Sequence, residues 1–117
     1  MTALPYTPAV AAGDLLFVSG QVGLVDGDLV DGFEDQCVAA LNNLQHALRD
    51  NGRTLSDLVK TTVFVTNAAD LAAMNKIYGE TFSEPRPARS TVVVSALPYG
   101  ACFEIEGIAS ASEAVAD

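Results

Sequence analysis

The 117-residue chain has little of what several common kinds of site require. It contains one histidine, His46, and two cysteines, Cys37 and Cys102, that share no metal-ligand spacing such as CxxC. The chain therefore has too few suitable residues to favour a zinc site or a histidine-activated nucleophile. Six basic residues stand against fifteen acidic ones, which gives a net charge of −9. Because lysine and arginine supply affinity for a phosphate backbone, this balance argues against nucleic acid as a partner and against nuclease activity.

Long apolar runs are also missing. No segment approaches the ~20 residues needed to span a bilayer, and the N-terminus has no basic region followed by an apolar one. We therefore expect no membrane partner and a cytoplasmic location, where both cysteines stay reduced as small buried residues. Half of the residues are apolar and 18% are charged, so we expect one globular domain, 1–117, with a patternless, frayed tail over 110–117.

The spacing of apolar residues predicts an α+β fold. Its element order is β-β-α-β-α-β-β, a mixed sheet with two helices packed on one face. The last two strands are joined around Pro98-Tyr99-Gly100 and are expected to pair as a hairpin. Strands are predicted at 15–20, 59–66, 90–96 and 101–109, a further hairpin around Asp26-Gly27-Asp28, and helices at 33–51 and from Asn67 to 82.

Two of the predicted strands are apolar on both faces. Residues 15–18 read Leu-Leu-Phe-Val, and residues 92–94 are three consecutive valines. Two helices can cover one face of a sheet, so the other face needs a different cover. The sheet of another subunit would supply it, which predicts a closed homo-oligomer.

Three charged residues lie in or beside these apolar strands. Arg89 precedes one strand, and Glu104 and Glu106 lie in the next. Charges in such surroundings need partners, because desolvating an unpaired ion costs several kcal/mol or more. A guanidinium matches a carboxylate bidentately, and a carboxylate can orient or deprotonate water. The set therefore suggests hydrolysis of a small carboxylic acid.

A symmetrical final hairpin would place Arg89 and Glu104 on one face, with backbones ~13 Å apart. That spacing leaves room for one small substrate between them. Simpler explanations stay open at this point. Arg89 could form a structural ion pair at a strand end, Glu104 and Glu106 could lie on a solvated face, and either glutamate could be the working carboxylate.

Six short segments, in order along nearly the whole chain, give it a resemblance to the Rid (YjgF) family of reactive intermediate deaminases. They are Pro5-Tyr6, 17–21 (FVSGQ), 58–66 (LVKTTVFVT), 74–78 (MNKIY), 87–90 (PARS) and 104–109 (EIEGIA). The chain departs from the family where Thr7-Pro8 follows Tyr6, in place of a common Ser-Gln, and where Thr91 stands in place of a cysteine found in some members.

The resemblance implies a homotrimer of chorismate-mutase-like fold with substrate clefts between subunits. It also implies cofactor-independent hydrolysis of 2-imino acids, which tautomerise with enamines, to 2-oxo acids and ammonia. In it, Arg89 binds the substrate carboxylate and Glu104 positions the attacking water. The remaining positions that it places in the cleft are Tyr6, Ser19, Gly20 and Asn75.

Other functions stay open from the sequence. The chain could be a module that binds small carboxylates such as 2-oxo acids without catalysis, since the same arginine would hold a product. It could hydrolyse another imine or amide in one pathway. The family is also described as an endoribonuclease or translation inhibitor, and the acidic balance of this chain counts against that activity.

Overall fold

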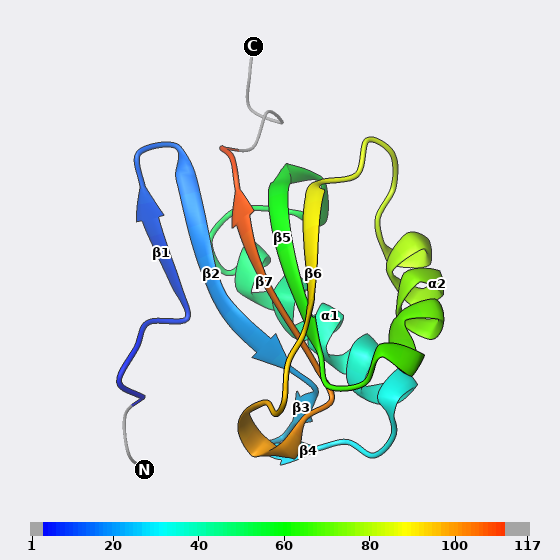
Figure 1. The fold of residues 1–117 in the computed structure, drawn as a ribbon. Helices are drawn as coiled ribbons and strands as arrows, with labels where there is room; N and C mark the ends of the chain where they lie inside the picture. The colour runs from blue at the N-terminus through cyan, green and yellow to red at the C-terminus, as the bar shows by residue number, and fades with distance from the viewer. Residues whose placement is uncertain (1–3, 112–117) are drawn as a thin grey trace.

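A computed structural model of the chain describes residues 4–111. A five-stranded mixed sheet in the order β1-β2-β7-β5-β6 carries two helices on one face (Figure 1). The strands of this sheet are β1 (Ala9–Ala12), β2 (Leu15–Val22), β5 (Leu58–Val65), β6 (Ala88–Val93) and β7 (Phe103–Ala109). A small ribbon of β3 (Leu24–Val25) and β4 (Asp28–Leu29) follows β2, and the helices are α1 (Phe33–Arg49) and α2 (Leu71–Thr81). The predicted α+β sheet with two helices is confirmed.

The core lies between the sheet and the helices because alternate strand residues and one stripe of each helix are apolar. In β7, Phe103 and Ile105 are fully buried, and α1 buries Leu44 and Leu48 against them. Each such side chain contributes about 1.5–3 kcal/mol by leaving water. The bounds of α1 lie within two residues of those predicted, and the bounds of α2 lie within four. Within residues 4–111 no helix is both long and apolar enough to cross a membrane.

The predicted hairpin of the last two strands is wrong. β5 lies between β6 and β7, parallel to β6 and antiparallel to β7. The cause is the segment β5-α2-β6, a βαβ unit in which the helical crossover returns the chain parallel to its first strand. Residues 94–102, with the short 3-10 turn η3 (Pro98–Gly100), then carry the chain past the end of β5 to β7 (Figure 1).

The sequence prediction also missed β1. Three of its four residues are alanine, which has low β-propensity, and only Val10 is β-branched. β1 nevertheless pairs with β2 through a two-residue turn, where Gly13 takes the positive φ that such turns need. At the other end of the chain, Ser110 is held in place. Its N–H donates to the Asp57 carbonyl oxygen at 2.8 Å, so a frayed tail begins no earlier than Ala111, and 112–117 lie outside the described residues.

The face of the sheet opposite the helices is open in the single chain. No element of residues 4–111 covers it, and the large apolar side chains Val10, Phe17 and Val92 are 52%, 43% and 41% exposed there. The face is less uniformly apolar than expected, because Glu104 and Glu106 of β7 also point to it. These two carboxylates lie beside a cavity at one end of the open face.

Candidate active site

A β-bulge in β2 shapes one wall of the cavity. Val18 pairs with Gly107 and Gln21 with Ile105, so β2 holds one extra residue in this interval. Such bulges redirect side chains and occur often beside functional sites. Here the bulge turns Ser19 toward the N-terminal segment. Its hydroxyl donates to the Thr7 carbonyl oxygen at 2.7 Å, and its N–H donates to the Pro8 carbonyl oxygen at 2.9 Å. These bonds fix the segment that carries Tyr6.

Gly20 allows the Glu104 carboxylate to lie against the backbone of β2. A Cβ atom at residue 20 would stand 1.9 Å from Oε2 of Glu104 and 2.9 Å from its Cδ. The backbone of Gly20 does not have a positive φ, so close approach is the reason that glycine is needed here. The absence of a side chain at Gly20 in β2 therefore makes room for the carboxylate of Glu104 in β7.

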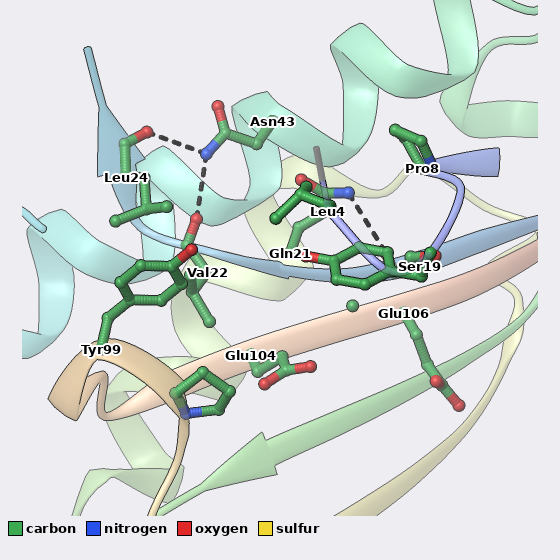
Figure 2. A pocket seen from close by; sticks show the side chains of 13 residues that line it. Leu4, Pro8, Ser19, Gln21, Val22, Leu24, Asn43, Tyr99, Glu104 and Glu106 are labelled. Carbon is green, nitrogen blue, oxygen red and sulfur yellow. Dashed lines mark hydrogen bonds between the residues drawn. The ribbon is translucent and has the colours of Figure 1, made fainter. Parts of the chain in front are cut away.

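The cavity has a volume of about 560 Å³. Glu104 and Glu106 project from β7 along its floor, and Tyr99 projects from the η3 turn (Figure 2). Four of the six site residues predicted from the sequence line it, namely Tyr6, Ser19, Gly20 and Glu104. The other lining residues are Leu4, Pro8, Gln21, Val22, Leu24, Asn43, Pro98, Tyr99 and Glu106.

The surroundings of Glu104 favour its protonated form. Partial burial raises the pKa of the Glu104 carboxyl above its usual value, and the nearby negative charge of Glu106 raises it further. A carboxylate with a raised pKa is a better proton acceptor near neutral pH than an ordinary exposed glutamate. A perturbed carboxyl in a cavity is also a typical feature of catalytic sites.

Arg89 lies on the opposite face of the sheet from Glu104, so the predicted shared face is wrong. In the pairing with β5, Arg89 is level with Thr61, whose side chain is fully buried under the helices. Glu104 is level with Phe64, three residues farther along β5 and therefore on the other face. Arg89 and Glu104 are two strands apart across the sheet and three residues apart along the strand direction. The standard strand spacing and rise per residue then give about 14 Å between their backbones.

Helix α2 holds the Arg89 guanidinium in a defined orientation. Nη2 of Arg89 donates to Oδ1 of Asn75 at 2.8 Å, and the guanidinium carbon, Cζ, lies 4.8 Å from the centre of the Tyr78 ring. Tyr78 is itself buried, and its hydroxyl hydrogen-bonds the Thr61 hydroxyl at 2.7 Å. Within residues 4–111 Arg89 forms no ion pair, so the structural ion pair considered above is not found there. An exposed, oriented guanidinium is suited to bind an anion.

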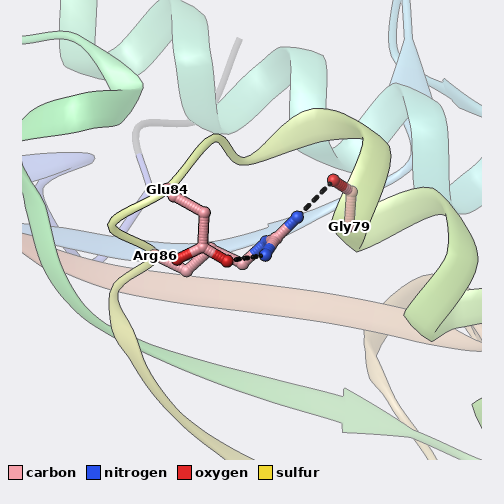
Figure 3. A network of polar contacts seen from close by, with 3 residues as sticks. All are labelled: Gly79, Glu84 and Arg86. Carbon is pink, nitrogen blue, oxygen red and sulfur yellow. Dashed lines mark hydrogen bonds and ion pairs between the residues drawn. The ribbon is translucent and has the colours of Figure 1, made fainter.

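The loop that leads into β6 is fastened to the end of α2. Arg86 donates through Nη2 to the Gly79 carbonyl oxygen at 3.0 Å and forms an ion pair with Glu84 (Figure 3). The ion pair is exposed and contributes ~0–1 kcal/mol. The bond to Gly79 is the more informative contact, because it joins the loop to the helix that also orients Arg89.

The predicted site residues therefore form two groups. The cavity group consists of Tyr6, Ser19, Gly20 and Glu104, and the arginine group consists of Asn75 and Arg89. Sequence reasoning missed Gln21, Asn43 and Tyr99 as lining residues of the cavity. Asn43 lies on α1 and donates to the carbonyl oxygens of Val22 and Leu24 at 2.9 and 3.0 Å. Gln21 lies in the segment 17–21 and Tyr99 in the turn Pro98-Tyr99-Gly100, but neither local pattern predicts a cavity, because distant elements bring the three residues together.

Neither cysteine belongs to either group. Cys37 is fully buried, and burial is the main cause that raises its thiol pKa to about 12. Cys102 is partly buried with a pKa raised chiefly by burial, and both thiols are free. Among residues 4–111 no three His, Cys, Asp or Glu side chains are placed to hold a metal ion. The two groups together present a carboxylate, a guanidinium, two hydroxyls and an amide.

The fold and the cavity define a small α+β protein with an acidic pocket at the end of its sheet. A family model described as Endoribonuclease L-PSP matches residues 1–111, and the chain belongs to this family, also called the Rid or YjgF family. The resemblance found in the sequence is confirmed.

Named relatives and solved structures agree with this assignment. Reactive Intermediate Deaminase A, chloroplastic, of Arabidopsis thaliana is 42% identical over 91% of this chain and 58% of its own length. The 2-iminobutanoate/2-iminopropanoate deaminase of Dermatophagoides farinae is 38% identical over 89% of this chain and 84% of its own length. The crystal structure of E. coli TdcF with bound serine has a TM-score of 0.89 and 34% identity, and the match covers 95% of this chain and 91% of that one.

Gly20→Ala should displace the Glu104 carboxylate with little loss of stability. The clash falls on the end of a side chain that can rotate away, so the melting temperature should change little. Once displaced toward solvent, Glu104 should titrate at a lower pKa than in the wild type, as NMR of the labelled carboxyl would show. Gly79→Ala is the matched control, because its Cβ meets no atom closer than 3.9 Å. An unchanged Glu104 pKa in Gly20→Ala would contradict the close approach.

Glu106→Gln should lower the pKa of Glu104. The negative charge of Glu106 raises the pKa of Glu104, and removing that charge makes the ionised form of Glu104 easier to reach. The same NMR titration would show the Glu104 midpoint shifted to lower pH. Glu80→Gln removes an exposed charge from α2, on the other side of the sheet, and should leave the midpoint unchanged. A Glu104 midpoint that rises in Glu106→Gln would refute this account of the cavity.

Proposed function

We propose that the protein hydrolyses 2-imino acids, and the enamines with which they tautomerise, to 2-oxo acids and ammonia without a cofactor. The observation that carries the proposal is that the chain holds two complementary groups, each fixed in place on its own face of the sheet. One is a carboxylate with a raised pKa in a cavity, Glu104, and the other is an exposed guanidinium oriented by α2, Arg89. The first can activate water and the second can hold a carboxylate, which are the two tasks that this hydrolysis requires.

In the proposed reaction Arg89 binds the substrate carboxylate and Glu104 accepts a proton from water. The water oxygen bonds to the carbon of the C=N group, and the π electrons move to nitrogen, which takes up a proton from solvent. Glu104 then returns its proton to nitrogen as the C–N bond breaks. The added hydroxyl releases its proton to solvent and becomes the 2-oxo group, and ammonia leaves. Fixing substrate and water in this geometry supplies much of the acceleration, because orientation is otherwise an entropic cost.

The two groups would come from different subunits. In one chain they lie on opposite faces of the sheet, about 14 Å apart at the backbone. All six residues of β6 are exposed, so this edge strand can lie against the cavity of a neighbour. When one surface of a subunit contacts a different surface of the next subunit, the same contact can repeat until the subunits close a ring. The family resemblance sets the ring at three subunits, and the open sheet faces would be covered inside it.

Two relatives support this function by name, since they are called deaminases of reactive intermediates or of 2-imino acids. The family model and some solved structures carry the name endoribonuclease instead. The bound serine of TdcF is a small molecule with a carboxylate, as the proposed substrate is. The cytoplasmic location stays a prediction, because the Arabidopsis relative is named as a chloroplast protein.

A non-catalytic module for small carboxylates is the second candidate, since Arg89 alone would hold a 2-oxo acid. Glu104 favours catalysis, because a second negative charge in the cavity does nothing to help bind an anion. Endoribonuclease activity is less well supported. The net charge of −9 and the two carboxylates of the cavity would repel an RNA backbone.

Glu104→Gln should abolish turnover while leaving product binding largely intact. Glutamine has nearly the same shape but cannot accept a proton from water, and loss of a general base typically costs ~10²–10⁴-fold in rate. The assay follows ammonia or 2-oxo acid released from 2-imino acids that an amino-acid oxidase generates in situ. Calorimetry with a 2-oxo acid should show binding close to that of the wild type.

Glu106→Gln is the matched control for Glu104→Gln and should have a mild effect, because it lowers the pKa of Glu104 but keeps the proton acceptor. Normal turnover by Glu104→Gln together with failure of Glu106→Gln would assign the base to Glu106. If the wild type binds 2-oxo acids and never accelerates ammonia release, the carboxylate-binding module becomes the better explanation.

Mixing two inactive variants should restore activity if each cleft takes Arg89 from one subunit and Glu104 from the next. In a mixed ring of Arg89→Ala and Glu104→Gln subunits, one interface joins an intact arginine to an intact glutamate. Random mixing into trimers should therefore recover about a quarter of wild-type activity. Light scattering should give the mass of a trimer for wild type and variants. A stable monomer at micromolar concentration, or no recovery from confirmed mixed rings, would contradict the shared cleft.

A further inference from the structure

The η3 turn holds a tyrosine in a left-handed backbone conformation. Tyr99 has φ 65° and ψ 7°, and the next residue, Gly100, has φ 73°. A bulky residue with positive φ is strained, and such residues gather at functional sites. Pro98 fixes its own φ, and the turn is closed by backbone bonds from Gly100 to Leu97 and from Ala101 to Pro98. The turn therefore fixes the direction in which the Tyr99 side chain leaves the backbone, and the side chain is 61% exposed in the single chain.

The Tyr99 side chain lines the same cavity as Glu104, at its apolar end. Its ring projects toward Val22 and Leu24, with Glu104 between it and Glu106 (Figure 2). The Asn43 amide nitrogen at this end already donates to two backbone carbonyls. The charged residues that line the cavity are both glutamates. Among the lining residues, this end thus offers aromatic and aliphatic surface and no cation.

We propose that Tyr99 forms one wall of a subsite for the substrate side chain, and that this subsite selects 2-imino acids with uncharged, apolar side chains. The proposal rests on the function proposed above. With the reacting carbon near Glu104, a side chain that extends away from Glu106 lies against Tyr99, Val22 and Leu24. An aliphatic side chain replaces water on these surfaces, which favours its binding.

An acidic side chain is disfavoured for two reasons. It would leave water at an apolar end that offers it no cation, and Glu104 and Glu106 would repel it. The arginine of the neighbouring subunit would already be engaged by the substrate carboxylate. Among imino acids of similar size, we therefore expect the leucine-derived one to be preferred over the glutamate-derived one.

The test compares kcat/KM for imines generated in situ from leucine, alanine and glutamate. Wild type should prefer the leucine-derived imine over the glutamate-derived one by about tenfold or more. In Tyr99→Gly the leucine-to-alanine ratio should fall about fivefold, because the aromatic wall is lost. Tyr99→Phe keeps the ring and should keep the ratio. Glycine adopts φ 65° without strain, so Tyr99→Gly should melt no lower than the wild type.

Asp26→Gly is the matched control. Asp26 also has a positive φ, 52°, in the turn between β3 and β4, and it does not line the cavity. Its replacement relieves the same kind of backbone strain and should leave the substrate ratio unchanged. An unchanged leucine-to-alanine ratio in Tyr99→Gly, or equal hydrolysis of the leucine- and glutamate-derived imines by the wild type, would overturn the proposal.

Binding measurements separate this inference from the proposed function. Calorimetry with 4-methyl-2-oxopentanoate, pyruvate and 2-oxoglutarate needs no catalysis. If the wild type hydrolyses no imine yet binds the first of these most tightly, and Tyr99→Gly loses that preference, the subsite stands and the deaminase function fails. If hydrolysis occurs but the three acids bind the wild type and Tyr99→Gly in the same order, the subsite fails and the deaminase function stands. Absence of both hydrolysis and binding would overturn both.

Discussion

The position of β5 between β6 and β7 keeps Arg89 and Glu104 apart, on opposite faces of the sheet. In the register of β6 with β5, Arg89 is level with Thr61, so it shares a face with Thr61 and points toward α2. In the register of β7 with β5, Glu104 is level with Phe64, so it points away from the helices. One strand thus separates the cation from the carboxylate, and a single chain carries both groups of the proposed site without bringing them together.

The Glu104 carboxylate and the Arg89 guanidinium are each held in place by different neighbouring residues. Glu104 can lie where it does because Gly20 has no side chain, and the bulge in β2 separately directs Ser19 to the N-terminal segment. Arg89 is oriented by Asn75 and Tyr78, and Tyr78 is fixed by its bond to the buried Thr61. Binding and catalysis are improved by groups that are already in place, since less entropy is lost when the substrate arrives.

Local signals in the sequence were sufficient for the helices, most strands and the identity of the charged residues. Apolar periodicity located α1 and α2, and a run rich in β-branched residues located β5. The pairing of the strands was not recoverable in this way. The predicted strands 90–96 and 101–109 left four residues between them, which suits a hairpin, whereas β6 ends at Val93 and β7 begins at Phe103, so the longer connection can pass β5. The assumed hairpin put Arg89 and Glu104 on one face, and one parallel pairing reversed that result.

Other misses have the same cause. Gly20 was assigned to the site by resemblance, but the reason for a glycine there, the approach of Glu104 from another strand, is visible only in three dimensions. Tyr99 appeared in the sequence as part of a turn signal, Pro98-Tyr99-Gly100. Its positive φ and its place in the cavity depend on how η3 folds back beside β2 and β7.

The separation of the charges bears on how the proposed cleft would work. The pKa of Glu104 is raised in the single chain by burial and by Glu106. An arginine brought from a neighbouring subunit would lower that pKa and weaken Glu104 as a base if it paired with it directly. The bond to Asn75 and the contact with Tyr78 hold the guanidinium against its own helix instead. A substrate carboxylate would then neutralise Arg89 at the moment when the base is needed, so binding the substrate would itself preserve the proton affinity of Glu104.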